Sequence, residues 1–374
     1  MSVAAVFFVN GAVFANWVAR IPEIQQKLGL SNGTLGVALL GTAVGAVIAM
    51  PTAGWLITYF GSRPVTKIAA LIYCTVLPLL ALAPNLLCLT LALVVFGALN
   101  GAMDVAMNAQ GIAVEKLYSR PIMSSFHGMF SVGGMVGAAS GGILAYAGFK
   151  PFPHLLGTAI LLGILVVLAS SRLLTTSLPP SVTQPVFVPS TSLFKLGTIA
   201  FCVLLGEGAI ADWSAIYLKR TLETGAGFAA AGYAVFSLAM AVCRFSGDRL
   251  TQQLGSVQVV RLGGSIAAIG LGLSLVIAQP ITALIGFASV GVGLSCIVPL
   301  VFSAAGRMPG IAPSLAIATV TTTGYCGFLC GPPLIGFVAD FFTLRVALGI
   351  VVITSAIGAM LAQSVRFSTP LKEF

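Results

Sequence analysis

Residues 86–114 read LLCLTLALVVFGALNGAMDVAMNAQGIAV, an apolar stretch in which Asp104 is the only charged side chain. A helix needs about 20 apolar residues to cross a bilayer. Within this stretch Asn100, Asp104 and Asn108 recur every four residues, so a helix places them on one face. Such a polar face does not point at lipid. The stretch therefore predicts a membrane-spanning helix that turns a polar face toward other helices.

The rest of the chain has the same apolar character. Hydrophobic residues make up 58% of its 374 residues, charged residues make up 7%, and 43 residues are glycine. A soluble domain carries about 25% charged residues. A water-soluble fold of this length could not cover its surface with so few charges, so this composition excludes a water-soluble domain. The net charge of +9 comes from basic residues spread singly over short loops. That pattern indicates orientation in a membrane and gives no sign of nucleic-acid binding.

Twelve stretches are long and apolar enough to span a membrane, and Pro, Gly and charged residues separate them. The first stretch lacks a basic leader and a small-residue cleavage site, so we expect a retained span and no cleaved signal. The predicted spans are 3–26, 33–59, 64–84, 86–114, 121–147, 153–172, 195–219, 226–250, 257–278, 281–304, 312–338 and 343–364. The sequence thus predicts an all-α membrane protein.

The longest polar stretch lies at mid-chain. Residues 173–194 are rich in Pro, Ser and Thr, which predicts a cytoplasmic linker between a bundle at 1–172 and a bundle at 195–374. The two parts also repeat: a shift of about 192 residues brings Gly101 onto Gly293. Two pseudo-symmetric six-helix bundles are the expected architecture.

The basic residues also predict the orientation. With the N-terminus in the cytoplasm, eleven Lys and Arg residues fall inside and five outside. Cytoplasmic loops carry an excess of Lys and Arg. We therefore expect a multi-pass protein of the inner (plasma) membrane with both termini cytoplasmic.

Charged side chains within spans are costly and are functional candidates by default. Burial without a neighbouring cation favours the neutral form of a carboxyl group, so Asp104 is expected to carry a proton or bind solute; a structural role between helices is the alternative. His127 also suits proton exchange, unless a backbone carbonyl or serine satisfies it. Glu207 lies deeper than Asp212, and five residues place the two about 140° apart around a helix. The in-span candidates are Arg20, Asp104, His127, Glu207, Asp212 and Arg244.

Two short motifs carry a resemblance to a known family. FGSRP (60–64) looks like the loop between helices 2 and 3 of the major facilitator superfamily, and RFSGDRLTQQLG (244–255) looks like its second-half copy. Thr58 stands at the usual acidic position of the first copy, whereas the second copy keeps Asp248 and Arg249. The resemblance implies two bundles around a central cavity, and with it a gating role for Arg244, Asp248 and Arg249.

Within that superfamily the chain is similar to the fucose permease-like sugar porters. The resemblance implies that Asp104, four residues before Asn108, handles the coupling proton, and that the polar residue on the fifth helix, His127, contacts sugar. Val18 stands near the family's acid on the first helix, so coupling rests on Asp104, with Glu207 as a second candidate. The similar stretches are ANWVARIPEIQQKLGLS (15–31), PTAG (51–54) and GAMDVAMNAQG (101–111).

Further residues are candidates for solute contact and gating. Trp17, Trp213 and Tyr325 are expected to contact solute, since aromatic rings stack on the apolar faces of sugars, and Asn10 is a further candidate. An interfacial aromatic belt is the alternative for Trp17 and Trp213. The offset of 192 pairs Arg20 with Asp212, which predicts an ion pair at the external ends of the first and seventh spans. Pairing of Arg20 with Glu23 is the competing expectation.

Together these features predict a secondary active transporter. The expected solute is small and polar, such as a sugar, polyol or amino-sugar, moved with protons by alternating access. Efflux of amphipathic compounds is the alternative within transport, and a membrane enzyme or passive channel is the alternative outside it. The seven cysteines form no C-x-x-C pair, so no metal or cofactor is expected. The expected partners are the solute, protons and membrane lipid, and the expected oligomeric state is a monomer.

Overall fold

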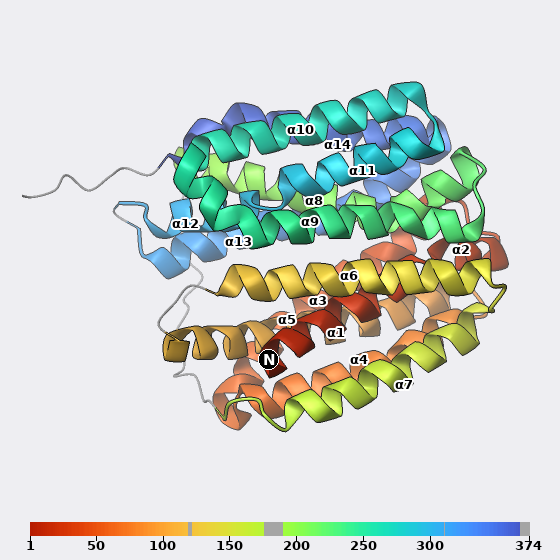
Figure 1. The fold of residues 1–374 in the computed structure, drawn as a ribbon, viewed down its shortest axis with the longest axis horizontal. Helices are drawn as coiled ribbons and strands as arrows, with labels where there is room; N and C mark the ends of the chain where they lie inside the picture. The colour runs from red at the N-terminus through yellow and green to blue at the C-terminus, as the bar shows by residue number, and fades with distance from the viewer. Residues whose placement is uncertain (119–121, 176–189, 310, 367–374) are drawn as a thin grey trace, which may run out of the picture.

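The computed structural model describes residues 1–118, 122–175, 190–309 and 311–366, and every regular element among them is helical. The helices run side by side along one direction (Figure 1). They are α1 (Ser2–Val18), α2 (Ile21–Leu28), α3 (Asn32–Phe60), α4 (Ser62–Leu82), α5 (Leu86–Tyr118), α6 (Met123–Tyr146), α7 (Pro151–Ser170), α8 (Thr191–Ile216), η1 (Tyr217–Thr221), α9 (Ala226–Leu254), α10 (Ser256–Ile277), α11 (Pro280–Leu294), α12 (Ile297–Gly306), α13 (Pro313–Phe341), α14 (Leu344–Met360) and η2 (Leu361–Val365).

Twelve helical segments of the described chain are long and apolar enough to cross a membrane. Four of them join two elements: α1 with α2, α8 with η1, α11 with α12, and α14 with η2. The predicted spans match these segments to within four residues at each end. The prediction of an all-α membrane protein with twelve spans is confirmed.

Local chemistry sets several helix ends. Ser31 caps α3 by accepting a hydrogen bond from the Thr34 amide at 3.2 Å. Gly29 ends α2 in the left-handed conformation at φ 62°. Gly61 and Gly255 stand before α4 and α10 at φ 81° and 79°, where a side chain would be strained.

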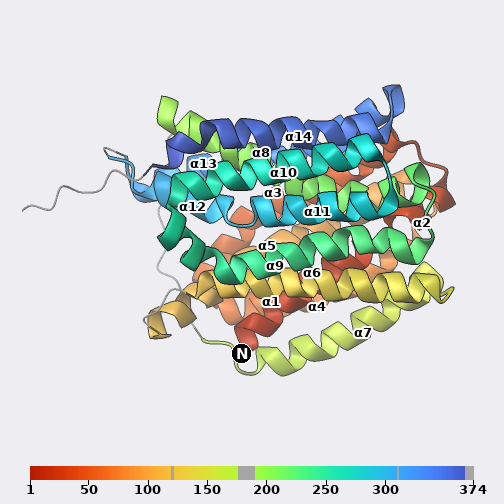
Figure 2. The same cartoon turned by 45° about the horizontal axis from the view of Figure 1, so that its top comes forward.

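The helices pack in the same pattern twice. In the first half α3 packs on α5, α1 on α6, and α4 on α7; in the second half α9 packs on α11, α8 on α13, and α10 on α14. Across the halves α6 runs along α9 and α3 along α13, and the α6–α9 pair stays adjacent in both views (Figures 1 and 2). We call the two ends of the bundle the α2 end and the α12 end, after the helices found there (Figure 1).

The mid-chain linker was predicted at 173–194. Residues 176–189 lie outside the described part of the chain, and α8 begins at Thr191, earlier than predicted. Before the gap, Leu174 is tied to Gln110, whose amide nitrogen donates to the Leu174 carbonyl oxygen at 2.7 Å and whose oxygen accepts from the Leu174 amide at 2.9 Å. The chain that leaves the first half is therefore fixed to α5.

Candidate functional site

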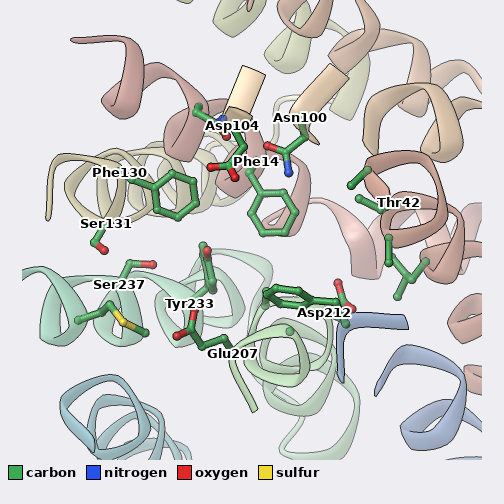
Figure 3. Close-up of a pocket in the computed structure, with 18 of the residues that line it drawn as sticks. Phe14, Thr42, Asn100, Asp104, Phe130, Ser131, Glu207, Asp212, Tyr233 and Ser237 are labelled. Carbon is green, nitrogen blue, oxygen red and sulfur yellow. The ribbon is translucent and has the colours of Figure 1, made fainter. Parts of the chain in front are cut away.

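A hollow lined by apolar residues and by several charged and polar side chains lies between the two halves. Its first-half lining comes from α1, α3, α5 and α6, and its second-half lining from α8, α9, α12 and α13. Figure 3 shows Asn100 and Asp104 on one side and Glu207 and Asp212 on the other. From Asp104 the hollow extends toward the α12 end, past Asp248 and side chains of α12.

On the first-half wall, three polar side chains form a hydrogen-bonded row. The Asn108 amide nitrogen donates to the Asp104 carboxylate at 3.1 Å and to the Asp104 carbonyl oxygen at 2.9 Å. The Asn108 oxygen lies 3.2 Å from His127 Nε2, which then carries the hydrogen as donor. Asp104 and His127 both line the hollow, and Asn108 lies between them. Asp104 and His127 therefore lie on the same wall of the hollow, as the sequence predicted, and the Asn108 side-chain amide connects them.

On the second-half wall, the Arg244 guanidinium contacts Glu207 of its own half and Ser131 of the first half. Its Nη2 lies 3.7 Å from Glu207 Oε1, and its Nη1 donates to Ser131 Oγ at 2.9 Å. The Arg244 and Glu207 side chains are 16% and 19% exposed, so water reaches both. Ser131 in turn donates to the His127 carbonyl oxygen at 3.2 Å. One cation thus connects Glu207 of α8 to α6 across the hollow.

Asp212 also lines the hollow, but it does not meet Arg20. Arg20 is 0% exposed, donates to both Glu23 oxygens at 2.9 and 3.0 Å, and donates from Nε to His154 Nδ1 at 2.9 Å. His154 Nε2 lies 2.8 Å from the Asn16 side-chain oxygen. The predicted Arg20–Asp212 ion pair is wrong for this conformation, because nearby partners within the first half hold Arg20.

Trp17 is a second correction. It is 1% exposed within the hydrophobic core and does not line the hollow, and the same holds for Trp213, which is 0% exposed. Trp17 lies seven residues, or about two turns, beyond Asn10 toward the α2 end. Phe14 is the last residue of α1 that lines the hollow, whereas Trp17 packs against protein and does not contact solute in this conformation. Asn10 itself lines the hollow.

The remaining predicted residues divide between the hollow and the surface. Asn100 and Tyr325 line the hollow, and Tyr325 lies where its deep part meets the part facing the α12 end. Asp248 lines the hollow near the α12 end, whereas Arg249 is exposed and does not. Neither residue forms an ion pair within the described part of the chain.

The sequence analysis missed several lining residues. Tyr233 and Ser237 lie one helical turn apart on α9 and line the hollow with the predicted Arg244, so this periodicity was a usable signal. Phe14 of α1 meets Tyr233 edge-on, with ring centroids 6.2 Å apart, and this contact brings the two halves together. No sequence pattern links Phe14 to Tyr233, because they belong to different halves.

The arrangement suits binding of a polar solute with apolar faces. Carboxylate, amide and hydroxyl groups offer hydrogen bonds from both walls, and aromatic rings line the space between them. Within the described residues, no group of three His, Cys, Asp or Glu side chains is placed to hold a metal ion. The fold and hollow define a helical membrane protein with two repeated halves around a central site that combines apolar, polar and charged side chains.

Comparison with known proteins identifies the family. The sequence profile of the Major Facilitator Superfamily matches residues 3–314. An uncharacterized MFS-type transporter of Yersinia pestis is 40% identical over 353 residues, covering 94% of this chain and 91% of that protein. Membrane protein MosC of Rhizobium meliloti is 34% identical over 367 residues, covering 96% and 88%. The chain belongs to the major facilitator superfamily and is a membrane transporter.

Solved structures agree on the fold. The nucleoside transporter NupG superposes with a TM-score of 0.71 at 13% identity, covering 97% of this chain and 98% of that chain. A bacterial homologue of the human lysosomal transporter Spinster superposes with a TM-score of 0.73 at 14% identity, covering 96% and 94%. At this identity the likeness concerns the fold alone. The relatives named as transporters support a transporter rather than an enzyme.

Proposed function

We propose that this protein is a secondary active transporter that moves a small polar solute together with protons by alternating access. The observation that carries the proposal is the Asp104–Asn108–His127 row facing the Glu207–Arg244 pair across the hollow. A carboxyl group in such a site can gain and lose a proton as its surroundings change. Asp104 is the proposed proton carrier because it faces the hollow and has no cationic partner among the described residues.

The charges of the hollow narrow the solute class. Among the described residues, Asp104, Glu207, Asp212 and Asp248 line it together with one Lys or Arg side chain, Arg244, which Glu207 already engages. An anionic solute would meet unfavourable charge, whereas a neutral or cationic one would not. Sugars, polyols and amino-sugars fit this balance, in keeping with the resemblance to fucose permease-like porters.

Efflux of amphipathic compounds is the second candidate function. Aromatic rings from both halves line the hollow, among them Phe14, Phe130, Tyr233 and Phe328. Apolar lining of this kind suits a larger hydrophobic solute. The carboxylates and amides in the same hollow favour the polar solute over this alternative.

The test is uptake into proteoliposomes under an imposed proton gradient. A thermal-shift screen of sugars, polyols, amino-sugars and amphipathic drugs on the purified protein first selects the solute. Proton-coupled transport predicts accumulation above the external concentration, which disappears when an uncoupler collapses the gradient. Accumulation that ignores the uncoupler would reject proton coupling, and mere equilibration in all conditions would indicate a passive channel. Stabilisation by drugs alone would favour efflux.

We further propose the bundle boundaries 1–172 and 195–374, a cytoplasmic linker at 173–194, and an inner-membrane location with both termini cytoplasmic. The excess of basic residues on one side supports this orientation. In it, the α2 end faces outward and the α12 end faces the cytoplasm. A reporter that is active only in the cytoplasm tests this orientation. It should be active when fused at the C-terminus and inactive when inserted between α2 and α3.

A further inference from the structure

At the α2 end, an acid of one half caps a helix of the other half. Asp340, near the C-terminal end of α13, accepts hydrogen bonds from the backbone amides of Asn32 and Gly33 at 3.0 and 2.8 Å. Asn32 and Gly33 begin α3. Both oxygens of the carboxylate are used, one for each amide. This contact joins residues more than 300 positions apart and belongs to neither wall of the hollow.

The start of a helix needs such partners. The first four amides of a helix lack acceptors within it, and its N-terminus carries partial positive charge. In α3, Ser31 serves the third and fourth positions, accepting from Thr34 through Oγ at 3.2 Å and from Leu35 through its carbonyl at 3.0 Å. The first two amides depend on Asp340. The second half therefore completes the cap of a first-half helix.

Glycines allow the close approach that this cap requires. A Cβ added to Gly33 would lie 2.7 Å from Asp340 Oδ2, and one on Gly36 would lie 2.4 Å from the Pro332 carbonyl oxygen. On the other helix, a Cβ on Gly336 would lie 2.5 Å from the Asn32 carbonyl oxygen. The two backbones thus touch directly, so any parting of α3 from α13 at this end must break both Asp340 hydrogen bonds.

The second cross-half contact at this end has no such cap. There α6 meets α9, and a Cβ on Gly227 would lie 2.8 Å from Tyr146 Cβ and 3.0 Å from the Gly142 carbonyl oxygen. Tyr146 lies beside Gly227 at the start of α9, as Asp340 lies beside Gly33 at the start of α3. Tyr146 is 88% exposed and accepts no hydrogen bond from a backbone amide of α9 among the described residues. Of these two cross-half contacts, and among the described residues, only the α3–α13 contact is held by a charge on a helix start.

We propose that Asp340 is a positioning residue of the transport cycle, a latch that holds the α2 end closed by capping α3 across the two halves. The inference rests on the alternating-access mechanism proposed above, because the α2 end must open in one part of that cycle. Asp340 is exposed at the end of the bundle, so water can replace its partners when the halves separate. Losing the latch should raise the fraction of molecules open at the α2 end.

Hydrogen–deuterium exchange on the full chain in lipid nanodiscs tests the latch without solute or proton gradient. Asp340→Asn keeps the size of the side chain but removes its charge and one acceptor oxygen. The latch predicts faster exchange at residues 32–36 and also at residues 226–232 of α9, which Asp340 does not touch. We expect about a tenfold rise at both, because a bias of about 1.4 kcal/mol changes a population ratio tenfold.

The matched control is Glu223→Gln, which removes an acid three residues before α9 that forms no hydrogen bond or ion pair among the described residues. Its exchange should match that of the wild type. Faster exchange confined to residues 32–33 would reduce Asp340 to a local cap, and an equal change in Glu223→Gln would reveal a general charge effect; either result overturns the latch. Asp340→Ser supplies a second neutral variant if Asp340→Asn does not fold. Because no solute is used, failure of the proposed solute or proton coupling leaves this result readable.

Discussion

The two halves of the transporter share a backbone but differ in chemistry. Gly61 and Gly255 adopt nearly the same conformation, with φ 81° and ψ 161° in the first half and φ 79° and ψ 153° in the second. The serine after each glycine is connected by hydrogen bonds to the C-terminal part of its own half. Ser62 Oγ accepts from Gln110, which holds Leu174, and Ser256 Oγ donates to the Val365 carbonyl oxygen at 3.1 Å.

The walls of the hollow show no such symmetry. The first half offers a row of neutral hydrogen-bonding groups ending in one acid, Asp104. The second half offers the Glu207–Arg244 ion pair and Asp212, which forms no ion pair among the described residues. The comparison teaches that the repeat specifies the scaffold and that the departures from it specify the chemistry. Mutations in the walls should therefore act differently in the two halves, and mutations in the scaffold should act alike.

The largest expected effect is on the first-half wall. Asp104→Asn keeps the shape of the side chain but removes its titration, so gradient-driven accumulation should fall to background while solute exchange without a gradient persists. Radiolabelled uptake and counterflow in proteoliposomes measure the two activities. Glu223→Gln, an acid outside the hollow, should retain both. Wild-type accumulation by Asp104→Asn would remove Asp104 from the coupling mechanism.

Next is the ion pair of the second-half wall. Arg244→Gln leaves Glu207 without its cation and weakens the bond to Ser131, and we expect a loss of about 1–3 kcal/mol in stability, below that of a fully buried pair because water reaches both groups. The double variant Arg244→Gln with Glu207→Gln should recover part of it. Thermal unfolding in detergent measures both. A double variant as unstable as the sum of the single variants would argue against pairing.

The scaffold prediction is symmetric. Gly61→Ala and Gly255→Ala each place a side chain in a backbone region that only glycine occupies readily, so each should lower stability by about 1–3 kcal/mol. The two losses should be equal within about 1 kcal/mol, since the conformations match. Gly157→Ala is the control, because its added Cβ would meet nothing within 4 Å. Unequal losses would show that the loops at Gly61 and Gly255 contribute differently to stability despite their matching conformations.

The smallest effect concerns the link between Asp104 and His127. Asn108→Ala removes hydrogen bonds to both residues, each worth about 1 kcal/mol, so the KM for solute should rise several-fold while the fold is kept. Ser140→Ala serves as control, because Ser140 bonds only to the Gly137 carbonyl oxygen of its own helix. Unchanged kinetics in Asn108→Ala would mean that Asp104 and His127 act independently.

Sequence reasoning predicted the spans well because the bilayer imposes a simple rule. Residues 86–114 had to form a helix of that length, and the helix α5 runs from Leu86 to Tyr118. The spacing of Asn100, Asp104 and Asn108 likewise fixed which face turns inward, because helical periodicity is local. The same reasoning failed for Arg20 and Trp17, whose surroundings depend on how α1 and α2 pack against α7 and the rest of the core.

The sequence by itself determined that the chain spans a membrane twelve times in two repeated halves, because apolar length and helical spacing are properties of consecutive residues. Only the tertiary structure decided that Arg20 meets His154, that Arg244 reaches Ser131, and that Asp340 caps α3. These contacts join residues more than 100 positions apart in the sequence. Their geometry depends on the packing of whole helices, which glycines such as Gly33 and Gly336 bring into backbone contact.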